Sequence, residues 1–193
     1  MCATEASNVN LECGARHESG HIVIAAVRGL RLKPEGLMVD PSGFGLACYH
    51  DAPEETDAAR ERNILAVLAG FAVEKRFREE HAYTPRDSMD VALNDDNVKA
   101  RTLLGKLNGI YAVNDSRLRK QLNDLIEQYW CSMEALASAL RGKNWEPIRP
   151  LKSGGQWSHP NETMAKYVGG EEAAQILAQQ GVSAVCGTGV ISS

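Results

Sequence analysis

The chain has 193 residues and an acidic balance, with 21 basic and 25 acidic side chains and a formal net charge of −4. This length suits one domain with a sizeable core, and the absence of a basic run argues against a nucleic-acid partner. Because no run of about 18 apolar residues occurs, we expect no membrane span.

The cysteines and the N-terminal residues indicate the cellular compartment in which we expect the protein. The five cysteines are scattered and form no CxxC pair: Cys2, Cys13, Cys48, Cys131 and Cys186. Dispersed thiols in odd number are typical of a reducing compartment rather than of a disulfide framework or a cysteine zinc site. The segment from Met1 to Glu5 also lacks the basic and apolar regions of a signal peptide. We therefore expect a cytoplasmic protein, with Cys13 as a thiol and not as a metal ligand.

The first predicted helix, residues 10–29, contains the most informative pattern of the chain. Asn10 is a suitable N-cap and Gly29 a natural C-terminal stop. Within this helix, His17 to His21 read HESGH, an HExxH pattern. Because four residues make about one helical turn, both imidazoles project from one face, where they can bind one Zn²⁺. Glu18 then stands where it can take a proton from a metal-bound water.

The competing interpretation of the HExxH pattern is a surface helix with two ordinary histidines. The residues that follow, 22–27, are apolar and largely β-branched or small, which favours a buried helix. Burying two histidines and a glutamate beside such a run is costly unless something pairs with them. The context therefore favours the metal site.

A short β-hairpin is predicted after the first helix. The apolar segments 37–39 and 44–49 flank a turn that contains Pro41 and Gly43. We expect this hairpin to be the only β structure of a mainly helical fold, packed on the helices because a two-stranded ribbon is marginal alone. Its free edge either accepts an extended peptide as an added strand or belongs to a flap without a ligand.

Three further long helices are predicted from hydrophobic periodicity, at residues 56–80 with Thr56 as N-cap, at 88–107 and at 115–140. The last reads as scaffold or as an oligomer contact. We divide the chain into a mainly helical domain of residues 1–150 and a Gly/Ser-rich tail of residues 151–193. The tail is expected to be loosely attached, with a short helix near residues 171–180.

Two carboxylates on later helices compete for the third ligand position, since a catalytic zinc site usually has three protein ligands and one open position. Glu74 lies among apolar residues, and it can instead hydrogen-bond a ligand histidine. Asp96 lies on an otherwise apolar stripe, where an unpaired carboxylate is expensive; a salt bridge or a helix cap is the alternative. Weaker candidates for polar roles at the site are Tyr49, His50, His81 and Tyr83, whereas His159 is expected to be exposed in the tail.

In order and content, these features resemble the peptidase domain of the FtsH-type zinc metalloproteases. The segment 17–21 resembles that family's HEAGH, residues 68–74 resemble its GGRAAEE segment, and residues 94–100 resemble its Asn-Asp-plus-alanine segment. The resemblance implies an aspartate as third ligand. Matching the aspartate four residues before Ala100 places this ligand at Asp96, and matching the Asn-Asp pair places it at Asp95.

The resemblance covers roughly residues 10–142 and has clear departures, with Ser19 for alanine, Phe71 for arginine and Lys75 for the second glutamate. The chain contains no GxxxxGK[ST] motif. The resemblance therefore implies a stand-alone, ATP-independent zinc endopeptidase that acts on peptides or unfolded proteins, as a homo-oligomer or with a separate partner protein. In this interpretation His17, His21 and Asp96 bind zinc, and Glu18 is the general base. The alternative is an inactive, peptidase-like module that binds peptides or serves as an adaptor.

Overall fold

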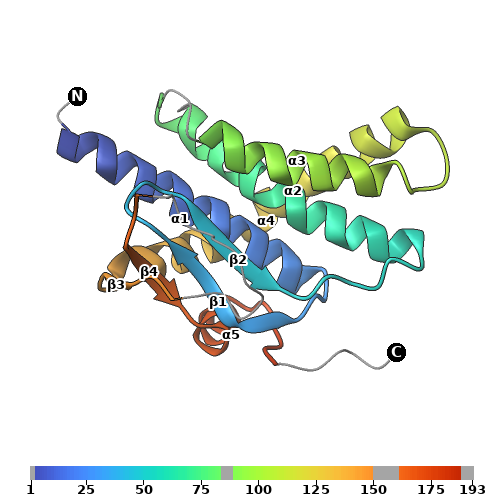
Figure 1. The fold of residues 1–193 in the computed structure, drawn as a ribbon. Coiled ribbons are helices and arrows are strands. Elements are labelled where there is room, and N and C mark those ends of the chain that lie inside the picture. Colours follow the sequence, from blue (N-terminus) through green and yellow to red (C-terminus); the bar gives the residue numbers. More distant parts are fainter. Residues whose placement is uncertain (1–2, 84–88, 150–160, 188–193) are drawn as a thin grey trace.

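The computed structural model describes residues 3–83, 89–149 and 161–187 (Figure 1). Within these ranges, residues 3–7 and 89–95 are described by their backbone alone. Its helices are α1 (Ala3–Val27), α2 (Asp57–Glu80), α3 (Met89–Leu104), α4 (Tyr111–Gly142) and α5 (Gly170–Gln179). Its strands are β1 (Leu32–Val39), β2 (Gly45–Tyr49), β3 (Glu146–Pro147) and β4 (Met164–Val168). The prediction of a mainly helical fold with a small hairpin is confirmed, and the HExxH segment lies on the first long helix.

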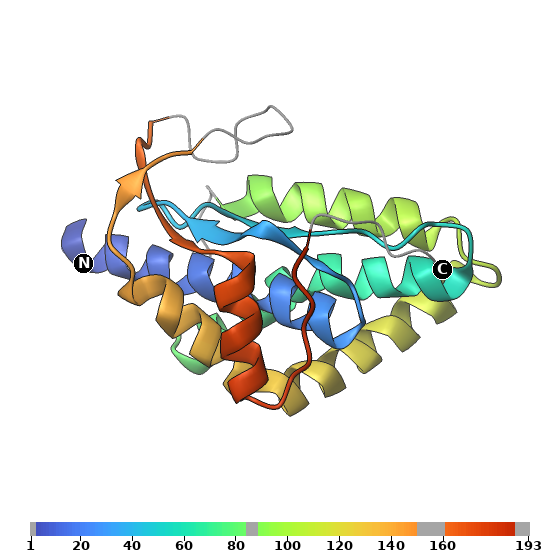
Figure 2. The ribbon, with the colours of Figure 1, turned by 90° about the horizontal axis from the view of Figure 1, so that it is seen from below.

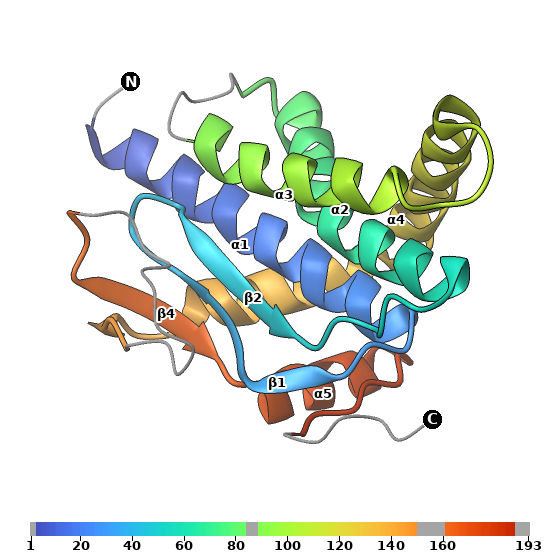
Figure 3. The same cartoon turned by 45° about the vertical axis from the view of Figure 1, so that its right-hand side comes forward.

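Helix α1 is the central element of the molecule. It lies between the sheet on one side and α2 and α3 on the other, and α4 packs against both α1 and α2 (Figure 3). Several of its apolar residues, among them Ile22 and Ile24, are fully buried in the main core. Within the described part of the chain, no helix is both long enough and apolar enough to cross a membrane.

The sheet is larger than predicted, because four antiparallel strands pair in the order β2-β1-β4-β3. The hairpin of β1 and β2 is therefore present but is not the only β structure. Strand β4 pairs with the side of β1 that the hairpin leaves open, through Leu37 opposite Val168 and Val39 opposite Lys166. As a result, β2 keeps an edge without a partner strand among the described residues.

The expectation of a loosely attached tail is wrong for its described part, residues 161–187. Strand β4 is an inner strand of the sheet, and α5, close to the predicted short helix, lies against β1 and α4 (Figure 2). Val168, Ala173, Leu177 and Val182 are buried in the same core as α1. These buried apolar side chains hold the segment against the core, although glycine and polar residues lie between them in the sequence.

Several helix boundaries also differ from prediction. Helix α1 begins at Ala3, so Asn10 is a buried residue inside the helix and not its N-cap. No helix breaker precedes Asn10, so the chain continues the helix upstream of this polar residue. Helix α4 begins at Tyr111 and has a kink at Tyr129, where φ is −111° and ψ is 17°.

Other boundary predictions are confirmed. Thr56 caps α2, since its side chain accepts a hydrogen bond from the amide of Ala59. Gly29 follows α1 with a φ of +77°, a conformation that glycine adopts without steric cost.

The hairpin turn holds β2 in a defined position beside α1. The buried carboxylate of Asp40 accepts hydrogen bonds from the amides of Ser42 and Phe44 at 2.9 and 3.0 Å, and from the Ser42 hydroxyl. The amide of Asp40 in turn donates to the carbonyl of Phe44 at 2.8 Å. These bonds fix the register with which β2 passes the HExxH segment.

Candidate metal centre

The two histidines of the HExxH segment lie one turn apart on α1 and are buried. His17 is 7% and His21 6% exposed, and their ring centroids are 4.7 Å apart. The Nε2 atoms of both rings approach one oxygen of Asp96 on α3, at 3.3 Å for His17 and 3.1 Å for His21. The structure therefore brings together three side chains whose ligand atoms lie within 4.8 Å of one another and that are able to hold a metal ion.

The two competing acids of the sequence occupy different positions. Asp96, with a side chain 27% exposed, faces the Nε2 atoms, whereas Glu74 binds the other side of His17. The side chain of Asp95 is not described, so of these two aspartates the structure places only Asp96 relative to the histidines. Asp96 is thus the acid that joins the two histidines, and Glu74 supports one of them.

The Nδ1 atoms of both histidines contact groups other than Asp96. His17 Nδ1 lies 3.1 Å from Oε2 of Glu74, and His21 Nδ1 lies 2.7 Å from the carbonyl oxygen of Ala66. A carbonyl oxygen only accepts, so His21 Nδ1 donates to Ala66, and Nε2 of the same ring faces Asp96. This arrangement is the usual support for histidine ligands.

Charge in this cluster is not balanced by its own side chains. Glu18, Glu74 and Asp96 supply three carboxylates, while Arg78, bound to Glu74, supplies one guanidinium. With neutral imidazoles, two negative charges are left over. Although burial opposes protonation, Asp96 and Glu74 raise the pKa of His17 to about 10. The same excess of negative charge favours a bound dication, which competes with that proton.

Glu18 lies between the histidines and strand β2. It is 6% exposed, and a Cβ atom placed on Gly45 of β2 would lie only 3.0 Å from its Oε1. Burial raises the pKa of Glu18, against the opposing effect of His17 and His21. A carboxylate with a raised pKa is suited to take up and return a proton near neutral pH.

Glycines allow α1 and α2 to approach closely at the cluster. A Cβ atom on Gly70 of α2 would collide with the Nε2 atoms of both histidines, at 2.6 Å from that of His17. A Cβ atom on Gly20 would meet Val73 and the carbonyl of Ala69 at 2.9 and 3.0 Å. The space beside the two Nε2 atoms therefore depends on glycine at position 70.

Arg78 is a residue of this centre that sequence reasoning missed. Its Nε donates to Oε1 of Glu74 at 2.6 Å, and both side chains are buried. Burial tends to raise the pKa of Glu74, but hydrogen bonds from His17 and Arg78 lower it overall. The signal available in the sequence was the spacing of four residues, which places Arg78 on the same helix face as Glu74.

The residues that were weaker candidates for polar roles at the site make other contacts. Tyr49 packs against the apolar cluster of Ala25, Leu30 and Ala66, and burial raises its pKa well above the ordinary value. His50 contacts the carbonyl of Gly187, and His81 contacts the carbonyl of Phe77 and stacks on Tyr83. Cys13 is a fully buried thiol whose pKa burial raises to about 11. His159 lies outside the described residues.

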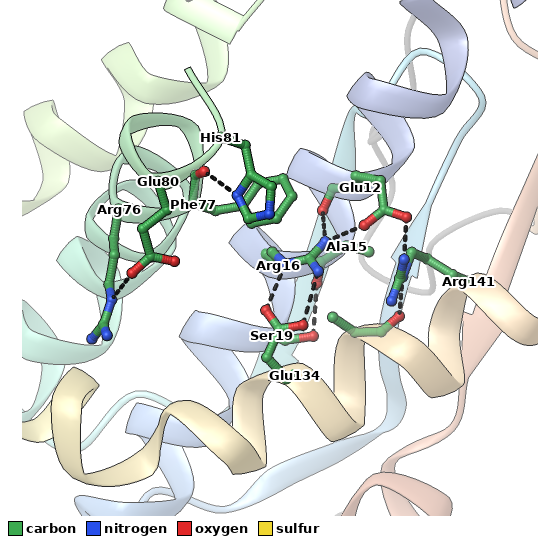
Figure 4. Close-up of polar contacts among 11 residues, drawn as sticks. Glu12, Ala15, Arg16, Ser19, Arg76, Phe77, Glu80, His81, Glu134 and Arg141 are labelled. Carbon is green, nitrogen blue, oxygen red and sulfur yellow. Dashed lines mark hydrogen bonds and ion pairs between the residues drawn. The ribbon is translucent and has the colours of Figure 1, made fainter. Parts of the chain in front are cut away.

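A second polar cluster lies beside the candidate metal centre and anchors α1 to α4 (Figure 4). Arg16 binds both carboxylate oxygens of Glu134, at 2.6 and 2.8 Å, and also pairs with Glu12. Glu12 in turn pairs with Arg141, and the guanidinium of Arg16 lies 3.7 Å from the ring centroid of Phe77. These contacts hold the helix immediately before His17 in place.

Comparison with known proteins assigns no family to the chain, since no family model and no curated protein matches it. The assignment of a function therefore depends on the geometry of the cluster formed by His17, His21, Asp96 and Glu18.

Proposed function

We propose that this protein is a zinc-dependent peptidase, related in design to the FtsH-type peptidase domain. In this proposal His17, His21 and Asp96 bind the metal, and Glu18 is the general base. The observation that carries the proposal is the convergence of the two Nε2 atoms on one oxygen of Asp96, with Glu18 buried beside them.

The chemistry of the ligand atoms favours zinc among common metal ions. Two imidazole nitrogens and one carboxylate oxygen form a ligand set known from catalytic zinc sites, which keep a further position for water. Oxygen-rich sets suit magnesium or calcium better. The two excess negative charges of the cluster support a divalent cation in the same place.

Zinc, when bound, lowers the pKa of a water molecule and polarises a carbonyl group. Glu18 accepts one proton from the attacking water while the hydroxide oxygen bonds to the peptide carbonyl carbon. When the carbon–nitrogen bond breaks, Glu18 returns the proton to the leaving amine nitrogen. One water is consumed, and one carboxyl and one amino terminus are formed.

The edge of β2 supports a peptide as the substrate. Because Phe44 directs its carbonyl toward β1, alternation along the strand directs the peptide groups of Gly45 and Ala47 toward the unpaired edge. An extended chain binds such an edge as an added strand. Gly45 also lies against Glu18, so a strand bound there would run past the proposed general base.

The test combines metal analysis with hydrolysis of an unfolded protein substrate in the absence of ATP. We expect about one zinc per chain in the wild type. We expect Glu18→Gln to retain zinc and to lose roughly 10²–10⁴-fold in rate. Glu79→Gln, on the exposed part of α2, is the matched control and should leave the zinc content and the rate of hydrolysis unchanged. A zinc-free wild type, or full activity in Glu18→Gln, contradicts the proposal.

The unpaired edge of β2 also suits a second function, a peptide-binding or adaptor module without catalysis. In that case peptides bind without being cleaved, and neither Glu18→Gln nor a zinc chelator changes the affinity. Measuring peptide binding and cleavage on the same samples separates the two functions.

We propose a cytoplasmic location because the described cysteines form no disulfide bonds. Among the described residues Cys13, Cys48, Cys131 and Cys186 are all free, as expected in a reducing compartment. Assembly into a homo-oligomer or with a separate partner stays a prediction from the sequence.

A further inference from the structure

We propose that Arg78 is a positioning residue of the metal centre, which orients the ligand His17 by holding the carboxylate of Glu74. This inference rests on the proposed zinc site and adds to it a residue that lies two contacts away from the ligand His17. It assigns to a buried ion pair within α2 a role in metal affinity.

The contacts form a continuous chain from α2 to α1. Glu74 uses its two oxygens for two different partners, with Oε1 accepting from Arg78 Nε at 2.6 Å and Oε2 lying 3.1 Å from His17 Nδ1. The side chains of Arg78 and Glu74 are 8% and 4% exposed, so water does not substitute readily for either partner. A carboxylate bound at both oxygens does not rotate freely.

The direction of His17 depends on this fixed carboxylate. While Glu74 Oε2 accepts the proton on Nδ1, the ring presents Nε2 toward Asp96 and His21. If Oε1 loses its donor, the carboxylate is free to turn toward another partner, and the His17 ring loses its support. His21 has a different support, the backbone carbonyl of Ala66, which cannot turn away.

The type of side chain at position 78 matters for the same reason. Arginine presents its Nε–H from a planar group of fixed geometry, whereas lysine presents a compact charge on a flexible chain. Lysine can restore the charge beside Glu74, but it orients the carboxylate less strictly. We therefore expect Arg78→Lys to recover part of the function that Arg78→Met loses.

A purely structural ion pair predicts a different pattern. Removing such a pair lowers the unfolding temperature by the same amount with and without zinc, and leaves zinc affinity unchanged. A positioning role lowers zinc affinity itself, so the rise in unfolding temperature on adding a fixed zinc concentration becomes smaller. Zinc affinity is therefore the measurement that separates the two roles.

The experiment measures zinc affinity of the full chain by chelator competition, together with the absorption spectrum of the Co²⁺-loaded protein. For Arg78→Met we expect an affinity roughly 10–100-fold weaker than wild type and an altered Co²⁺ spectrum. Arg78→Lys should lie between the two. The matched control is Arg76→Met on the same helix, whose arginine pairs with the exposed Glu80 and Glu127; it should bind zinc as the wild type does.

The double variant Glu74→Gln/Arg78→Met removes both buried charges and keeps the inference testable if Arg78→Met alone does not fold. It should bind zinc with the affinity of Glu74→Gln, because Arg78 acts only through Glu74. Wild-type zinc affinity in Arg78→Met, or a further loss in the double variant, overturns the inference while the zinc site stands. A wild-type chain that binds no zinc overturns the proposed function and this inference together.

Discussion

Two polar clusters lie on α1, and they differ in charge balance. In the anchor cluster, Arg16 and Arg141 face Glu12 and Glu134, so two positive charges meet two negative ones. In the candidate metal centre, three carboxylates face the single guanidinium of Arg78. The balanced cluster is complete within the protein, whereas the unbalanced one favours a cation from outside. Charge balance thus distinguishes the anchor cluster from the candidate metal centre on the same helix.

The largest expected effect follows from removing a ligand of the unbalanced cluster. Asp96→Ala should lower zinc affinity by more than the ~100-fold that loss of a supporting residue costs, because it removes one of three ligand atoms. Zinc content after dialysis against a weak chelator is the measurement.

Asp95→Ala is the matched control for this variant, because it changes the neighbouring carboxylate, which the family pattern also allows as ligand. It should keep its zinc. The opposite result, with zinc lost in Asp95→Ala and retained in Asp96→Ala, would transfer the ligand position to Asp95.

A smaller but clear effect is expected from filling the space beside the two Nε2 atoms. Gly70→Ala introduces a methyl group at 2.6 Å from His17 Nε2, so the rings must move or the helices must separate. We expect zinc binding to weaken strongly and the free energy of unfolding to fall by about 1–3 kcal/mol, as for other overpacked sites. Titration with zinc and urea unfolding measure the two effects.

Gly142→Ala is the control for Gly70→Ala, since a Cβ atom there meets no neighbouring atom within 4 Å. It should change neither zinc affinity nor stability to a comparable degree. Unaltered zinc binding in Gly70→Ala would mean that the metal does not use the Nε2 face.

Breaking the balanced cluster should affect stability and leave the metal centre intact. Arg16→Met removes the partner of Glu134 and one of the two arginine partners of Glu12, and both carboxylate side chains are about a third exposed. We expect a loss of roughly 2–3 kcal/mol, below the 3–5 kcal/mol typical of fully buried pairs. Urea unfolding with and without zinc should give the same loss. A fall in zinc affinity comparable with that of Asp96→Ala would refute the separation of the two clusters.

Much of the fold was predictable because it depends on local patterns. Helical periodicity located α2, α3 and α4, and the Pro/Gly turn located the hairpin. The start of α1 was misplaced because Asn10 is a good N-cap only where the preceding residues leave the helix, and here they continue it. The segment around Val168 and Leu177 was interpreted as a tail because glycine and serine residues are frequent after residue 150, and that composition does not show which apolar side chains reach the core.

In the candidate site, too, some features follow from local sequence and others from tertiary packing. The spacing of the HExxH segment by itself determined that His17 and His21 share one helix face with Glu18 beside them, because the helical repeat acts over four residues. Which carboxylate meets the two Nε2 atoms was decided only by the packing of α3 against α2, which brings Asp96 to α1 and leaves Glu74 behind His17. The pairing of Glu74 with Arg78 and the closeness of Gly45 to Glu18 likewise required the tertiary structure, since contacts between distant segments depend on how whole elements pack and not on any local pattern.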